Sequence, residues 1–222
     1  MIELPVRREP ANAAAIVLHG LGADGSDLQP LAGNIWNEAS AKWLFPEAPL
    51  QPVTINDGMR MRAWYDIRTA RLRDWEDADG IRTSADRINA LIDEQEQAGI
   101  AAERIVLAGF SQGGVISLAA GLSRTRRLGA IVALSCYLPL AETLLTQAPA
   151  ASQTTPIFIA TGDDDVIMEP AAAAESARLL EKRGHPVRLR NYPMGHAICP
   201  DEIADIRDFL AGNIAAAAAE SA

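Results

Sequence analysis

The chain has 222 residues, of which 49% are hydrophobic, and its 29 acidic against 20 basic residues give a formal net charge of −9. This apolar content excludes a disordered chain, and the length fits one domain over residues 1–222, with a core over about residues 13–211. The acidic balance argues against a nucleic acid partner, because phosphate backbones are bound by surplus Lys and Arg.

Short apolar runs alternate with helical patterns along the chain. Buried strands are predicted over residues 13–18, 43–46, 104–108, 129–134 and 156–160, and a half-exposed strand over 187–192. Helices are predicted over residues 81–98, 111–122, 171–183 and 201–215, and the tail 215–222 is expected to fray. Strands that alternate with helices in this way favour a doubly wound, mostly parallel α/β sheet with helices on both faces.

Targeting and redox signals are absent from the sequence. Residues 1–9 lack the apolar core of a secretory signal, and no apolar run approaches the length that spans a bilayer. Cys136 and Cys199 are too few for a disulfide framework. We therefore expect a cytoplasmic protein without stable membrane insertion. Residues 49–80 match neither pattern, and they are predicted to form a long functional loop because their aromatic residues argue against disorder.

A glycine-rich sequence joins the strand at 104–108 to the helix that follows. Gly109-Phe110-Ser111-Gln112-Gly113 fits the pattern G-x-S-x-G, which holds an exposed serine on a strained strand–turn–helix elbow. The helix N-terminus then directs backbone N–H groups, including that of Gln112, toward an oxyanion. The pattern predicts Ser111 as a nucleophile; the alternative is a glycine-rich turn with an incidental serine.

The other members of a Ser-His-acid triad should follow the serine along the chain. Of the three histidines, His19 precedes Ser111, and His185 lies in a polar turn and is expected on the surface. His196 follows the last predicted strand and is therefore the candidate general base. Residues 163–165 are three aspartates at the end of another strand, and one of them is the candidate acid. A metal site there is disfavoured because no spaced ligands accompany them, so neither a metal nor another cofactor is expected.

The chain resembles the phospholipase/carboxylesterase family of α/β-hydrolases, which includes bacterial carboxylesterases and acyl-protein thioesterases. The resemblance covers roughly residues 13–211 and rests on four motifs in order, namely His19-Gly20-Leu21-Gly22, Met61-Arg62-Ala63-Trp64-Tyr65-Asp66, Gly109-Phe110-Ser111-Gln112-Gly113-Gly114 and Tyr192-Pro193-Met194-Gly195-His196. It implies an α/β-hydrolase fold, and the bacterial carboxylesterase branch looks nearest. The implied activity is hydrolysis of short- to medium-chain acyl esters through an acyl-enzyme, with acyl-protein thioesterase or lysophospholipase activity as the alternative.

The resemblance also implies individual roles. The acid falls on Asp165, although a shifted register would place it on Asp164. The backbone N–H groups of Leu21 and Gln112 would form the oxyanion hole. This chain departs from the family pattern at Thr161, where the family usually has His, and at Glu169, which comes before the expected proline.

Substrate binding is less specified by the sequence. Trp64 is a candidate for the pocket wall, with a buried structural role as the alternative. Only about twenty residues separate the predicted strands at 129–134 and 156–160, too few for a cap domain, so we expect an open site with residues 49–80 as its only substantial wall. The expected partner is a small acyl ester or thioester, and a homodimer is compatible with the sequence.

Overall fold

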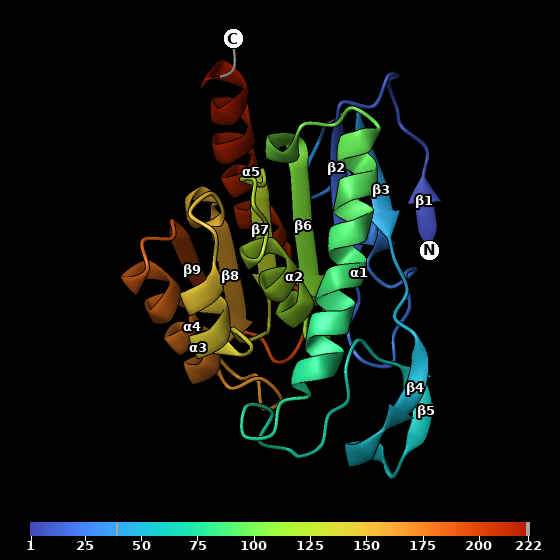
Figure 1. The fold of residues 1–222 in the computed structure, drawn as a ribbon, viewed down its shortest axis with the longest axis vertical. Coiled ribbons are helices and arrows are strands. Elements are labelled where there is room, and N and C mark those ends of the chain that lie inside the picture. The colour runs from blue at the N-terminus through green and yellow to red at the C-terminus, as the bar shows by residue number, and fades with distance from the viewer. Residues whose placement is uncertain (39, 221–222) are drawn as a thin grey trace.

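The computed structural model describes residues 1–38 and 40–220 and shows a twisted seven-stranded sheet (Figure 1). The strand order is β1-β3-β2-β6-β7-β8-β9, and every pair is parallel except β1 with β3. The strands are β1 (Ile2–Leu4), β2 (Ala13–Leu18), β3 (Ala41–Phe45), β6 (Ile105–Phe110), β7 (Ala130–Leu134), β8 (Ile157–Gly162) and β9 (Val187–Tyr192). Since the five central strands run in one direction, their carboxyl ends meet at one edge of the sheet, the lower edge in Figure 1.

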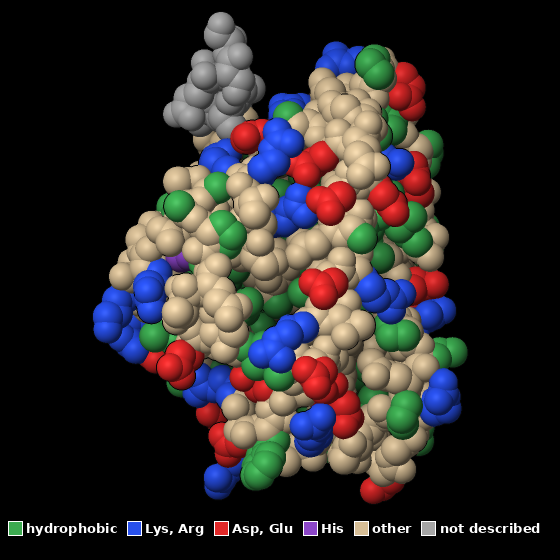
Figure 2. Space-filling model, in the orientation of Figure 1, with side chains coloured by type: hydrophobic (Ala, Val, Ile, Leu, Met, Phe, Trp, Pro, Cys, Tyr) green, Lys and Arg blue, Asp and Glu red, His purple; other side chains and the backbone are tan. Residues whose placement is uncertain are grey.

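Helices cover both faces of this sheet. One face carries α1 (Ala78–Gln97), α2 (Gln112–Leu122), α3 (Ala141–Gln147) and α4 (Pro170–Lys182), and the other carries α5 (Pro200–Glu220). Four short 3-10 turns are also described, at Gln29–Leu31, Thr54–Asn56, Ala102–Arg104 and Ser152–Thr154. Basic and acidic side chains are interspersed over the face that carries α1 and α4 (Figure 2).

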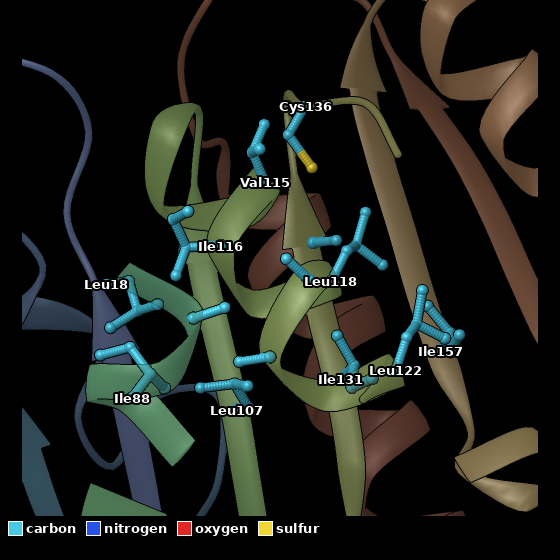
Figure 3. Packing of buried hydrophobic residues seen from close by; sticks show 14 of the residues in the cluster. Leu18, Ile88, Leu107, Val115, Ile116, Leu118, Leu122, Ile131, Cys136 and Ile157 are labelled. Carbon is cyan, nitrogen blue, oxygen red and sulfur yellow. The ribbon is translucent and has the colours of Figure 1, made fainter. Parts of the chain in front are cut away.

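Two apolar layers lie on opposite sides of the sheet because successive strand residues point to opposite faces. Beneath α1 and α2, Ile88 and Ile116 lie beside Leu18 and Leu107 (Figure 3). Beneath α5, the second layer joins strand residues such as Val106, Val132 and Phe158 to Ile206, Phe209 and Leu210 of the helix. Because both faces of the sheet are buried, its central strands must be apolar along their whole length.

Residues 49–80 contain regular structure that the sequence interpretation did not assign. Strands β4 (Leu50–Val53) and β5 (Met59–Arg62) form an antiparallel hairpin, and α1 already begins at Ala78. The turn places Asp57 at φ 53° and Gly58 at φ 75°, both in the left-handed region. An Asp-Gly pair is a recognised hairpin signal because these residues tolerate that conformation. The remaining part, residues 63–77, is irregular.

Two further expectations need correction or completion. His185 is only 3% exposed, so the prediction of a solvated surface histidine is wrong. The chain turns inward after Gly184, at φ 87°, and the backbone N–H of His185 donates to Leu180 O. Helix α5 is described to Glu220, and residues 221–222, the end of the tail that was expected to fray, lie outside the described part of the chain.

The order of these elements is that of the α/β-hydrolase fold, as expected. Between β7 and β8 the chain forms only the seven-residue α3 and one 3-10 turn, so no cap domain covers the carboxyl edge of the sheet in the described structure. No described helix combines the length and the apolar character needed to cross a bilayer.

Candidate active site

Ser111 lies at the sharp turn between β6 and α2. Its backbone has φ 54° and ψ −120°, a conformation that is strained for a residue with a side chain and is fixed by its N–H donating to Leu134 O at 2.8 Å. A Cβ on Gly109 would overlap the backbone of Gly113, and a Cβ on Gly113 would overlap Leu18 O. The two glycines of the motif are therefore required for the backbone to pass this closely.

The two predicted oxyanion-hole residues flank Ser111 and line the same cavity. Leu21 follows β2 on the adjacent loop, where a Cβ on Gly20 would lie in van der Waals contact, at 3.5 Å, with the Cβ of Ser111. Gln112 is the first residue of α2, so its N–H lies at the positive end of the helix dipole. Within the described residues, neither N–H donates to a protein acceptor, and both remain available to a ligand.

His19 holds the loop that carries Leu21. Its Nε2 accepts the N–H of Ala48 at 3.1 Å, so Nδ1 carries the proton and donates to Gly20 O at 2.7 Å. Burial lowers the pKa of His19 and keeps the ring neutral. This arrangement gives His19 a supporting role in positioning the loop.

Trp64 lies beneath this loop and is 2% exposed. Its indole Nε1 donates to His19 O at 2.9 Å, and the two rings lie 5.3 Å apart. Trp64 does not belong to the described cavity lining, which differs from the expectation that it forms the pocket wall. The alternative of a buried structural residue describes its position.

The side chain of Gln112 connects the elbow to the segment after β5, a contact that sequence reasoning missed. Its Oε1 accepts the N–H of Trp64 at 2.9 Å, and its Nε2 donates to Tyr65 O at 2.8 Å. No local pattern indicates this bridge, because it joins residues 47 and 48 positions apart. It fixes the start of α2, whose first residue, Gln112, lines the cavity.

His196 and Asp165 form a close pair on the loops after β9 and β8. Nδ1 of His196 lies 2.7 Å from Oδ2 of Asp165, whose other oxygen accepts the N–H groups of Ile167 at 3.0 Å and Met168 at 2.8 Å. Asp165 is 3% exposed, whereas Asp164 is exposed and bonds Met194 O through its backbone N–H. The geometry therefore favours Asp165 over Asp164 as the partner of the imidazole.

Gly162 lets the histidine loop approach the end of β8. A Cβ at this position would overlap the carbonyl oxygens of Met194 and Gly195. The His196 ring then lies 4.8 Å from that of Phe110, the residue before the candidate nucleophile. Ser111 and His196 both line one cavity.

This cavity has a volume of about 610 Å³ and is predominantly apolar, within the range of small-molecule sites. Its described lining comprises Gly20, Leu21, Ala23, Asp27, Leu28, Ile55, Tyr65, Ile67, Leu72, Phe110, Ser111, Gln112, Ile167, Met168, His196, Ala197 and Ile198. Residues 49–80 supply four of these, but segments 20–28 and 167–168 supply further wall. The expectation that residues 49–80 form the only substantial wall is therefore wrong.

No cluster of three or more His, Cys, Asp or Glu residues suited to a metal ion occurs in the described parts of the chain. The histidine, carboxylate and serine side chains instead provide a base, its orienting partner and a hydroxyl beside two free N–H groups. Such a set can transfer an acyl group through a covalent intermediate.

Fold and site together define a serine hydrolase of the α/β-hydrolase class. Residues 3–214 match the family model described as Phospholipase/Carboxylesterase, and the chain belongs to that family. Acyl-protein thioesterase 1 of Yarrowia lipolytica is 38% identical over 221 residues, covering 95% of this chain and 97% of the relative.

Solved structures agree with this assignment. Arabidopsis thaliana SOBER1 superposes with a TM-score of 0.85 at 30% identity, covering 91% of this chain and 99% of that chain. Zea mays acyl-protein thioesterase 2 gives a TM-score of 0.84 at 25% identity, with coverages of 96% and 98%. The names of the Yarrowia and Zea relatives favour the thioesterase alternative over the carboxylesterase interpretation drawn from the sequence.

Proposed function

We propose that this protein hydrolyses medium-chain acyl thioesters of acylated protein cysteines, using Ser111 as nucleophile, His196 as general base and Asp165 as the acid of the triad. The observation that carries the proposal is the 2.7 Å contact between His196 Nδ1 and Asp165, beside Ser111 in an apolar cavity. The 38% identity to an acyl-protein thioesterase supports the thioester over the oxygen ester.

The proposed reaction follows from these positions. Because Asp165 holds Nδ1, the Nε2 of His196 is the nitrogen free to take the proton of Ser111 as its Oγ attacks the acyl carbon. The oxyanion accepts hydrogen bonds from the backbone N–H groups of Leu21 and Gln112. His196 returns the proton to the departing thiol, and the same base then activates water, which releases the carboxylic acid and frees Ser111.

The shape and lining of the cavity support a medium-length acyl chain. It is predominantly apolar, and about 610 Å³ can hold a chain of this kind without a covering domain. We also propose a cytoplasmic location, as the residue pattern of the sequence led us to expect. The two described cysteines, Cys136 and Cys199, are free, which is compatible with a reducing compartment.

The test is a series of acetyl, octanoyl and palmitoyl thioesters of a cysteine peptide, with matched p-nitrophenyl esters. We expect kcat/KM to be highest for the octanoyl thioester, and Ser111→Ala to lose nearly all turnover. Ser123→Ala, at the far end of the same helix, is the matched control and should keep it. Faster turnover of every oxygen ester than of its thioester would favour the carboxylesterase alternative.

A further inference from the structure

The Trp-Tyr-Asp motif contributes more than its buried tryptophan. Asp66, its last residue, is directed toward the tip of the β4–β5 hairpin and not toward the triad. Its Oδ1 accepts the N–H of Thr54 at 2.7 Å, and its Oδ2 accepts the Thr54 hydroxyl at 2.6 Å. Two short bonds to one carboxylate fix both the backbone and the side chain of Thr54.

These two hydrogen bonds between Asp66 and Thr54, the Asp66–Thr54 clamp, lie directly beside the apolar cavity. Ile55 and Ile67, the next residues along each segment, both line it, and the N–H of Ile55 donates to Ile67 O at 2.8 Å. Ile55 is 42% exposed, so packing alone does not hold it in place. The hairpin and the following segment lie side by side at the lower end of the molecule (Figure 1).

A second carboxylate anchors the clamp to the body of the protein. The backbone N–H of Asp66 donates to Asp77 Oδ2 at 3.0 Å, while Oδ1 of Asp77 accepts from Gly80 N at 3.3 Å at the start of α1. Arg68 also reaches Asp77, at 3.2 Å. Helix α1 is packed against the core through Ile81 and Ile88, so the wall is tied to a rigid element.

We infer that Asp66 is a positioning residue that sets the acyl-chain selectivity of the enzyme, by holding the Ile55–Ile67 wall in place through Thr54. The inference rests on the proposed function, because it gives that wall the acyl chain as its ligand. A chain long enough to reach the wall gains apolar contact only when the wall is ordered. We expect an acetyl group not to reach this wall, so that its turnover does not depend on Asp66.

The test compares KM and kcat for acetyl and decanoyl thioesters in Asp66→Ala, Asp66→Asn and Thr54→Val. In Asp66→Ala we expect KM for the decanoyl substrate to rise about tenfold, while its kcat and both acetyl constants change less than about twofold. Asp66→Asn should retain most of the selectivity, since its amide can accept the Thr54 N–H and donate to the hydroxyl. Thr54→Val removes only the hydrogen bond of the hydroxyl and should give a smaller rise in KM for the decanoyl substrate. If Asp66→Ala does not fold, Thr54→Val provides the test in its place.

Asp79→Asn is the matched control, because the Asp79 side chain is 98% exposed and forms an ion pair with the neighbouring Arg82. An unchanged chain-length profile in Asp66→Ala and Thr54→Val would overturn the inference, as would equal losses on acetyl and decanoyl substrates. Binding of decanoic acid provides a readout without turnover, and we expect Asp66→Ala to weaken it. Unchanged binding would overturn the inference, whereas failure of the proposed function would appear as absent thioester turnover in the wild type.

Discussion

Asp165 holds the imidazole of His196 from one oxygen and the backbone of its own turn from the other. The His196 contact measures 2.7 Å, and the two N–H groups of Ile167 and Met168 lie 3.0 and 2.8 Å from Oδ1. The carboxylate is thereby fixed before any substrate binds. Such an orienting acid sets the imidazole tautomer and stabilises the imidazolium that forms during acyl transfer.

Exchanging the carboxylate for an amide tests this role. Asp165→Asn is expected to lower kcat by about 10³- to 10⁴-fold, because an amide in this position favours the wrong tautomer of His196. Asp164→Asn is the matched control and should change kcat less than about threefold, since its side chain is exposed. Steady-state kinetics on one octanoyl thioester measures both. The reverse ranking would move the acid to Asp164.

The close passage of the histidine loop at Gly162 gives a second prediction. Alanine there would push against the carbonyl oxygens of Met194 and Gly195 and displace His196 from the elbow. We expect kcat/KM to fall about 100-fold, the loss that a small misplacement of a catalytic group produces. In Gly212→Ala, by contrast, the new Cβ meets no atom within 4 Å. That control should keep full activity and gain about 0.5–1 kcal/mol of stability from its better helix propensity; equal effects of the two substitutions would contradict the account.

Glu202 predicts a pH dependence of stability that is separate from catalysis. It is 0% exposed in the first turn of α5, and burial raises its pKa from 4.5 to about 7, an effect that the nearby N–H of Cys199 opposes only in part. Because the folded state binds this proton more tightly than the unfolded state, the contribution of Glu202 to stability is fully present below pH 4.5 and is lost as the pH rises through about 7.

Glu202→Gln removes this titration. Its free energy of unfolding relative to wild type should therefore rise between about pH 5 and pH 8, by up to about 3 kcal/mol. Urea unfolding at both pH values measures the change. Glu94→Gln, on the exposed face of α1, is the control and should show no such trend. A difference between Glu202→Gln and wild type that is the same at both pH values would rule out the proposed origin.

The sequence indicates the order of strands and helices because each central strand is a continuous apolar run. Ala13–Leu18 and Ile157–Gly162 are buried along their whole length, as a sheet covered on both faces requires. The three-residue β1 is too short for any periodicity to show. The β4–β5 hairpin does have a local signal, since Asp57-Gly58 is a pair that tolerates the left-handed turn.

The candidate site likewise contains residues that the sequence predicts and contacts that it does not. Ser111 and His196 follow from motif and order, because strand ends must converge at one edge of a parallel sheet. The bridge from Gln112 to Trp64 and Tyr65, and the clamp of Asp66 on Thr54, depend on which loops meet in space. The sequence Gly184-His185-Pro186 has the composition of an exposed turn, which is why it predicts a surface histidine. The His185 ring is nevertheless buried.

The most direct test of the central claim is covalent labelling of the nucleophile. An alkyl fluorophosphonate should attach to Ser111 of the wild-type protein, as located by mass spectrometry of its peptides, and should label Asp165→Asn much more slowly. Ser111→Ala should remain unlabelled while keeping the unfolding midpoint of a folded protein. Equal labelling of Ser111→Ala and wild type would contradict the assignment of Ser111 as the nucleophile.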